Sequence, residues 1–203
     1  PRYPDKSVYT EYGYDSRGNR TSITGPIPNN TLTTFEYDRT DNLLTRTVDA
    51  AIGGLRLVTA YEYDNLGRLK KTSIDPFGLN LVTQNEYDNE GRLKQATDPE
   101  GATTEYFYYD NGWLRETKRR LTASEYAITQ YYYDVNGNRI RVIDPEGHST
   151  VSTYNLLDQL ETVTDPAGNV TQYLRETCGC CAAAWVTDPR GNTTYTKYDE
   201  LKR

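Results

Sequence analysis

The cysteines of the chain lie close together, at Cys178, Cys180 and Cys181. Thiolates bind zinc, but a structural zinc site commonly uses pairs of C-x-x-C, and only Cys178 and Cys181 have that spacing here. A redox C-x-x-C normally opens a helix of a βαβ unit, a pattern that the sequence lacks. Small residues packed in a tight turn are therefore the favoured interpretation. A disulfide between two of the thiols and a metal site at Cys178, Cys180 and Cys181 stay open as alternatives.

The 29 Asp and Glu residues offer many carboxylate pairs of the kind that hydrolyses glycosides. Most Asp residues, however, recur at one position of a repeated frame, where turn chemistry explains them. No serine has the G-x-S-x-G context, and His148 is the one histidine that could act as a base. The chain has no phosphate-binding G-x-x-x-x-G-K-[ST] and no D-x-D-x-D calcium loop. We therefore expect no enzyme activity, no cofactor and no dedicated metal site.

The repeated frame is D-x-x-G, which occurs nine times. Asp at the first position of a type I turn accepts hydrogen bonds from backbone N–H groups two residues on, and Gly at the fourth position tolerates positive φ. The frame therefore predicts structural turns. They run from Asp15 to Gly18, Asp64 to Gly67, Asp75 to Gly78, Asp88 to Gly91, Asp98 to Gly101, Asp134 to Gly137, Asp144 to Gly147, Asp165 to Gly168 and Asp188 to Gly191.

Two kinds of turn alternate, one preceded by Tyr and the other with Pro after the Asp. Consecutive turns lie about 10 to 13 residues apart, which leaves room for one strand between them. Aromatic residues two apart, such as Tyr61 and Tyr63, lie on one face of a strand. We expect a meander of hairpins with Leu43, Leu69, Leu93 and Leu160 on the strands that leave the turns. The interior Tyr rows would contain Tyr14, Tyr37, Tyr63, Tyr87, Tyr109, Tyr133, Tyr154 and Tyr198.

Several copies of the frame are imperfect. Residues 38–41 and 155–158 lack the Gly, and residues 110–112 are one residue short. Longer loops at 25–30, 49–55 and about 118–124 replace Asp-Pro turns. The segment 177–181 stands where a Tyr-Asp turn is due, so residues of about 169–191 form a variant repeat that contains the cysteines. If function lies on loops, these are the positions where it is expected, although tolerated insertion explains them as well.

Composition narrows the function classes. The chain has 19 Tyr and many Thr, which favour pleated strands. Its net charge of −6 does not favour a phosphate-binding surface, so nucleic acid is not an expected partner. No stretch approaches the roughly 18 apolar residues that span a bilayer, and no signal-peptide core is seen at the start. We expect no membrane span.

The motif from Tyr87 through Asp88, Gly91, Leu93 and Asp98 to Gly101 closely resembles the YD repeat of the Rhs family. That family includes bacterial Rhs proteins, the C components of insecticidal toxin complexes, and teneurins. The resemblance covers residues 12–198 and implies a ribbon of hairpins that spirals into a hollow shell and, in toxin members, encloses an effector. The conserved segment where toxin members cut themselves has no match here, so no catalytic residue is carried over.

The expected fold is all-β, with tandem antiparallel β-hairpins forming a spiralling YD-repeat ribbon, as part of a shell or a solenoid. Residues 1–203 would form a single array of about eight to nine hairpins, as a fragment of a larger protein. The expected function is a non-catalytic scaffold in a shell, stalk or fibre, secreted or at the surface of a bacterial cell. Its partners would be neighbouring repeats, further copies of itself, or an enclosed effector. The alternative is a carbohydrate-binding or adhesion module that uses Tyr-rich sheet faces and binds surface glycans.

Overall fold

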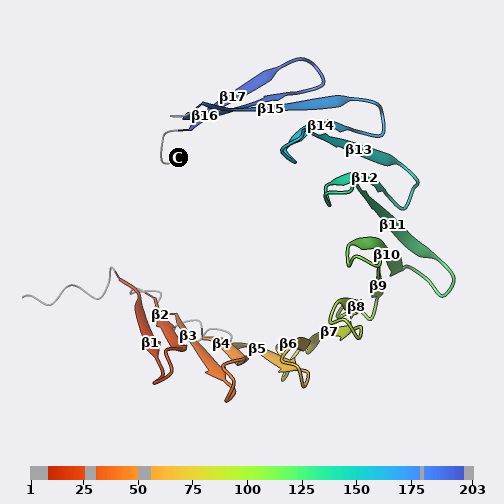
Figure 1. Cartoon of the computed structure of the whole chain (residues 1–203). Coiled ribbons are helices and arrows are strands. Elements are labelled where there is room, and N and C mark those ends of the chain that lie inside the picture. The colour runs from red at the N-terminus through yellow and green to blue at the C-terminus, as the bar shows by residue number, and fades with distance from the viewer. Residues whose placement is uncertain (1–8, 26–30, 50–55, 179–180, 199–203) are drawn as a thin grey trace, which may run out of the picture. The chain divides into compact units, whose positions relative to one another are not determined.

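The computed structural model describes residues 9–25, 31–49, 56–178 and 181–198. Every regular element within these ranges is a β-strand (Figure 1). The described residues include no helix long and apolar enough to cross a membrane. The chain divides into two compact units, Pro1–Thr103 and Thr104–Arg203. The predicted all-β fold of tandem antiparallel hairpins is confirmed.

The first unit is a ladder of strands in sequence order. Each strand pairs antiparallel with the next, from β1 with β2 through to β7 with β8. The strands are β1 (Glu11–Tyr14), β2 (Arg20–Thr24), β3 (Leu32–Tyr37), β4 (Leu43–Asp49), β5 (Arg56–Tyr63), β6 (Leu69–Ile74), β7 (Leu81–Tyr87) and β8 (Leu93–Thr97).

The second unit repeats the same arrangement from β9 to β17, again with antiparallel pairing between consecutive strands. The strands are β9 (Thr103–Tyr108), β10 (Leu114–Arg120), β11 (Tyr126–Tyr133), β12 (Arg139–Ile143), β13 (Ser149–Tyr154), β14 (Leu160–Thr164), β15 (Val170–Cys178), β16 (Cys181–Thr187) and β17 (Thr193–Tyr198).

A β-bulge recurs in each hairpin that is closed by a Tyr-Asp turn. In β5 and β6, Tyr63 pairs with Leu69 and Glu62 pairs with Lys71, so Lys70 is the extra residue. The same shift occurs in the six equivalent hairpins, whereas the pairing across the Asp-Pro turns is regular. A bulge increases the local twist and bends the strand. The Tyr-Asp edge of each unit is therefore the bent edge.

The described residues contain no fully buried hydrophobic side chain. The buried residues are Thr47, Thr59 and Ser73, which lie on the neighbouring strands β4, β5 and β6. Tyr and Leu side chains of the predicted rows, such as Tyr63 and Leu69, are half-buried. Apolar contact is thus spread along the sheet surface, as expected for repeats that cover only their neighbours.

The predicted long loops are described only in part. Residues 26–30 and 50–55 lie outside the described residues. The third loop is shorter than expected, because β10 continues to Arg120 and β11 begins at Tyr126. The run Lys118 to Arg120 is therefore strand, and Lys118 lies over the ring of Tyr126 at 4.0 Å.

Candidate functional site: the junctions between hairpins

The turn aspartates hold the loops together as their sequence position predicts. In the turn that begins at Asp64, one carboxylate oxygen accepts hydrogen bonds from the backbone N–H of Leu66 (2.9 Å) and of Arg68 (3.0 Å). The other oxygen pairs with Arg68 Nε at 2.7 Å. Gly67 N–H donates to the Asp64 carbonyl, which closes the turn. The same backbone contacts to the Asp carboxylate recur in eight further turns.

These hydrogen bonds hold the turn carboxylates in the ionised form. The Asn42 side-chain amide, with the backbone N–H groups of Thr40 and Asn42, lowers the pKa of Asp38 from 3.8 to about 2. For Asp134, Asp165 and Asp188 the amide of the Asn four residues on likewise lowers the pKa. A general acid near neutral pH needs a raised pKa. These four aspartates are therefore structural acceptors, and their lowered pKa values do not suit a general acid.

Eight of the nine predicted turn glycines have positive φ, between 76° and 92°. Gly78 is the one that differs. There Asp75 itself has a φ of 51°, Asn80 has a φ of 49°, and Leu79 N–H donates to the Asp75 carboxylate at 2.9 Å. A Cβ at Gly78 would collide with the Asp75 side chain, so Gly is needed for space at this turn and not for its φ.

In two turns Asp replaces the Gly and takes its backbone conformation. Asp41 has a φ of 67° and Asp158 a φ of 57°. Each carboxylate accepts a hydrogen bond from an Asn of the preceding Tyr-Asp turn, Asn19 for Asp41 (2.6 Å) and Asn138 for Asp158 (2.7 Å). At positive φ, Asp41 and Asp158 thus each link two neighbouring hairpins. The absence of Gly from these turns in the sequence did not predict this link.

At four turns the Tyr before the first turn residue joins its hairpin to the preceding one. The hydroxyl of Tyr63 donates to the carbonyl of Leu43 at 2.9 Å, and that of Tyr87 donates to the carbonyl of Leu69 at 2.8 Å. Tyr37 bonds to the carbonyl of Arg20 and Tyr154 to that of Arg139 in the same way.

The position of these acceptors explains why a Tyr is required. The pairing of β4 with β5 ends at Thr45 and Ala60, so Leu43 lies beyond the ladder and its carbonyl has no strand partner on that side. Unpaired backbone carbonyls are costly when they are shielded from water. The Tyr63 hydroxyl satisfies this carbonyl where the hairpins separate. Burial accordingly raises the pKa of Tyr63.

Among the remaining predicted row residues, Tyr133 is half-buried, and burial raises its pKa. Tyr14 is 61% exposed and has no hydroxyl contact with another described residue. The Tyr198 side chain lies outside the described residues. Of the row tyrosines, Tyr37, Tyr63, Tyr87 and Tyr154 therefore make the junction contact with the preceding hairpin.

In the turn of residues 109–112 the hydrogen-bonding pattern is shifted by one residue toward the N-terminus. Tyr109, and not Asp110, takes the first position: its N–H donates to the Trp113 carbonyl, and Gly112 N–H donates to the Tyr109 carbonyl. Strand β9 accordingly ends with Tyr108 paired to Leu114. The Tyr109 hydroxyl donates forward to the Tyr131 carbonyl at 3.1 Å.

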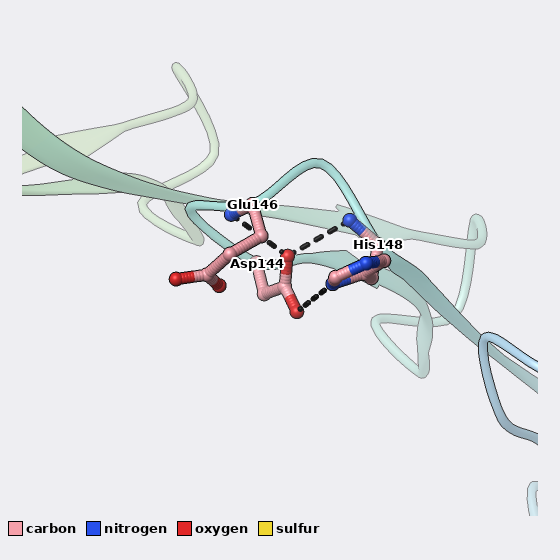
Figure 2. Close-up of side chains that lie close together, drawn as sticks. All are labelled: Asp144, Glu146 and His148. Carbon is pink, nitrogen blue, oxygen red and sulfur yellow. Dashed lines mark hydrogen bonds and ion pairs between the residues drawn. The ribbon is translucent and has the colours of Figure 1, made fainter.

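Asp144, Glu146 and His148 bring three potential metal ligands together at one Asp-Pro turn (Figure 2). Their ligand atoms lie within 4.8 Å of one another. His148 Nδ1 lies 3.1 Å from Asp144, and the N–H groups of Glu146 and His148 bond to the same carboxylate. His148 takes the place that Asn or Arg takes in other turns, so turn chemistry accounts for the cluster. That position, four residues after each Asp, is the signal by which the sequence could have located His148.

The cysteine segment forms a tighter hairpin than a Tyr-Asp turn. Strand β15 continues through Cys178, which pairs directly with Cys181 at the start of β16. Two residues separate this pair, compared with five between Tyr63 and Leu69. Cys180 lies outside the described residues, as do the side chains of Cys178 and Cys181. The packing of small residues in this turn stays a prediction, and the disulfide and the metal site stay its alternatives.

Fold and junctions together define an all-β repeat protein in which each hairpin packs against the next. Residues 133–170 match the family described as RHS Repeat, which confirms the resemblance of the chain to the YD-repeat (Rhs) family. No curated protein matches the sequence.

Solved structures share the fold over nearly the whole chain. The crystal structure of TcdB2-TccC3-Cdc42 matches 98% of this chain and 13% of its own, with 14% identity and a TM-score of 0.57. The crystal structure of TcdB2-TccC3 matches 96% of this chain and 13% of its own, with 13% identity and a TM-score of 0.57. The chain thus spans about an eighth of the length of these relatives. The similarity to these structures shows that the chain shares their fold, a ladder of antiparallel hairpins.

Proposed function

We propose that this chain is a wall segment of a larger YD-repeat assembly, a shell, stalk or fibre that is secreted or lies on the surface of a bacterial cell, and that it has no enzyme activity of its own. The observation that carries the proposal is the series of Tyr hydroxyl contacts between consecutive hairpins, at Tyr37, Tyr63, Tyr87 and Tyr154. Each contact joins one hairpin to the next, and such contacts extend a wall by simple repetition.

The chemistry of the recurrent residues supports a scaffold. Turn carboxylates have lowered pKa values and are engaged with backbone N–H groups. The row tyrosines Tyr63 and Tyr87 are half-buried and use their hydroxyls inside the sheet. A glycan-binding face would need exposed rings with free polar tips. The rows therefore favour the scaffold over the adhesion alternative.

Enclosure of an effector is the finer form of this proposal. The family resemblance implies it, and the similarity of fold to the TccC3-containing structures is compatible with it. This chain covers only 13% of those proteins. It would therefore supply one part of an enclosing wall, with neighbouring repeats or further copies of itself as its direct partners and the effector on the enclosed side.

Electron microscopy of the purified chain across a concentration series tests the scaffold. Strand edges that lack a partner invite pairing with another copy. We expect ribbon-shaped particles. Filaments that lengthen with concentration would assign a fibre, and ribbons of constant size would assign a segment of a shell or stalk. Compact particles without ribbon shape would contradict the proposal.

A glycan array tests the adhesion alternative separately. Tyr12 and Tyr14 are 53% and 61% exposed, so their rings are accessible to a ligand. Saturable glycan binding that disappears in a variant with Tyr12→Ala and Tyr14→Ala would replace the scaffold by an adhesion module. We expect no such binding.

A further inference from the structure

The turn that uses the shifted frame borders a cavity of about 500 Å³. Aromatic side chains form most of its lining, and the polar groups come from the turn itself. The principal lining residues are Tyr109, Asp110, Asn111, Trp113, Tyr132 and Tyr133. All belong to the second unit, where they lie in the turn between β9 and β10 and on strand β11.

Because the frame is shifted by one residue, the Asp110 carboxylate does not accept the hydrogen bonds that stabilise the other turns. In other Tyr-Asp turns the Asp accepts hydrogen bonds from two backbone N–H groups and from the side chain four residues on, as Asp64 does from Arg68. Here Tyr109 stands in that position, and the residue four further on is Trp113. Asn111 takes over one backbone contact, from Trp113 N–H at 3.1 Å. Asp110 is exposed and has no hydrogen bond or ion pair with any described residue.

The rings around the cavity stand at steep angles to one another. Trp113 and Tyr133 have ring centroids 5.3 Å apart and are tilted by 42°, and Tyr109 meets Tyr133 edge to face at 88°. Trp113 packs over Gly137 of the following turn, where an added Cβ would lie 2.8 Å from its ring. Inclined aromatic rings beside a carboxylate are the arrangement that recognises ammonium groups through cation–π attraction.

The polar groups of the cavity suit a cation better than a sugar. The hydroxyl of Tyr109 is engaged with the Tyr131 carbonyl, and that of Tyr132 with Gln130. A sugar would need several free hydrogen-bonding groups and a flat ring to stack on. A cation needs only the ring surfaces and one carboxylate. The lining residues include Asp110 and no basic side chain. Two arginines lie close by: Arg139 lies over the ring of Tyr131 and Arg141 over the ring of Tyr132, each 5.8 Å from the ring centroid. The ring of Tyr132 therefore already contacts a cation, which leaves the rings of Tyr109, Trp113 and Tyr133 for a ligand.

We propose that the cavity formed by Tyr109, Trp113 and Tyr133 with Asp110 binds an organic cation, either a free alkylammonium compound or the basic side chain of a peptide. The scaffold would thus carry one recognition site, at the Tyr-Asp turn whose frame is shifted. This site is independent of whether the wall encloses an effector.

Trp113 provides the reporter for the test. The substitution Trp185→Phe removes the second tryptophan, which packs against Tyr195 outside the cavity, so the tryptophan emission of the W185F protein comes from Trp113 alone. Titration with choline should give a saturable change in this emission. The uncharged isostere 3,3-dimethylbutan-1-ol should have an affinity at least about tenfold lower, since it lacks the charge that the rings and Asp110 attract.

A charge variant tests the role of Asp110. In the W185F background, Asp110→Asn should weaken choline binding about tenfold at low ionic strength and leave the urea midpoint unchanged, because Asp110 makes no described contact. Glu161→Gln, which removes an exposed carboxylate elsewhere in the second unit, should leave binding unchanged. Short peptides with one Lys, trimethyl-Lys or Arg distinguish a side-chain ligand from a free cation: tighter binding of a peptide than of choline assigns the side chain.

Four results would overturn the proposal. They are equal binding of the uncharged alcohol, an unchanged affinity in Asp110→Asn, binding of glucose or N-acetylglucosamine in place of the cations, and no saturable response to choline or to any peptide. None of these results bears on the particle shape seen by electron microscopy. The failure of this site and the failure of the scaffold are therefore distinguishable.

Discussion

Neighbouring Tyr and Asp side chains have separate roles in each turn. Asp64 secures the loop of its own hairpin, whereas Tyr63 reaches the carbonyl of Leu43 in the preceding hairpin. The Asp therefore stabilises a local turn, and the Tyr stabilises the contact between units of the repeat. Loss of the Asp should therefore destabilise its own turn, and loss of the Tyr should destabilise the contact between two hairpins.

Tyr63→Phe should lower the free energy of unfolding by about 1 kcal/mol, because the ring is retained but the half-buried Leu43 carbonyl loses its hydrogen bond. The measurement is urea unfolding followed by circular dichroism. Tyr14→Phe is the matched control at the same position of the repeat, where the hydroxyl has no described acceptor and the ring is 61% exposed. Equal effects of the two substitutions would show that the hydroxyl contact is not the reason for the Tyr.

Gly101→Val should lower the free energy of unfolding by about 1 to 3 kcal/mol, because Gly101 has a φ of 83°. A Cβ at this position would have no atom within 4 Å, so the cost is one of backbone conformation and not of space. Asn tolerates this conformation better than other residues do. Gly101→Asn should therefore cost clearly less in the same urea experiment, and equal costs would argue against the backbone explanation.

At the scale of the elements, the bulges and the short ladders act together. Each bulge bends the hairpin near its Tyr-Asp turn, and the ladder to the next hairpin stops before that turn, as at Thr45 and Ala60. The hairpins therefore separate at this edge. Side chains such as Tyr63, or the ring of Trp113 over Gly137, fill the space between them.

Gly137→Ala should be more destabilising than Gly147→Ala. Both glycines have positive φ, of 92° and 84°, so both variants have a similar backbone cost of about 1 kcal/mol. Only at Gly137 would the new Cβ meet a neighbour, Trp113 Cζ2 at 2.8 Å, whereas nothing lies within 4 Å of a Cβ at Gly147. We expect an additional loss of about 1 to 3 kcal/mol at Gly137 from overpacking, measured as the difference between the urea unfolding energies. Equal losses would mean that Trp113 moves aside without cost.

The sequence predicted the turns and the strands because their signals are local. Asp and Gly at fixed spacing fix a turn, and aromatic residues two apart fix a strand face, so β5 and β6 could be placed from Tyr61, Tyr63 and Leu69 alone. The acceptor of each Tyr hydroxyl could not be predicted, since it depends on where the ladder between two hairpins ends. The frame shift at Tyr109 was missed for a similar reason: the Asp110–Gly112 spacing was visible, but which residue closes the turn depends on the pairing of β9 with β10.

For the whole molecule, stability is spread over many equivalent contacts. No described hydrophobic side chain is fully buried, so no single cluster acts as the core of either unit. Turn carboxylates with lowered pKa values recur along both units, including those of Asp15, Asp38, Asp64, Asp88, Asp134, Asp144, Asp165 and Asp188. Their effects on folding should add, because most lie far apart.

Acid should therefore unfold the chain progressively. A carboxylate whose pKa is lower in the folded state contributes stability that is fully present above its unfolded pKa and is lost as the pH falls through the folded value. For Asp38 this window runs from 3.8 down to about 2. The urea midpoint should stay level above about pH 5 and fall steadily from about pH 4 to pH 2. Asp38→Asn should make this decline shallower, and a midpoint independent of pH across the same range would contradict the role given to the turn carboxylates.

The sequential pairing of strands has a mechanical consequence. Within each unit the strand contacts join consecutive elements, β3 with β4, β4 with β5 and so on. A chain pulled from one end would thus lose its hairpins one at a time, each release lengthening it by a similar step without loosening hairpins farther along. The same property would let each hairpin form as soon as its own residues are free to pair, so the sheet of each unit could be built up in the order of the sequence.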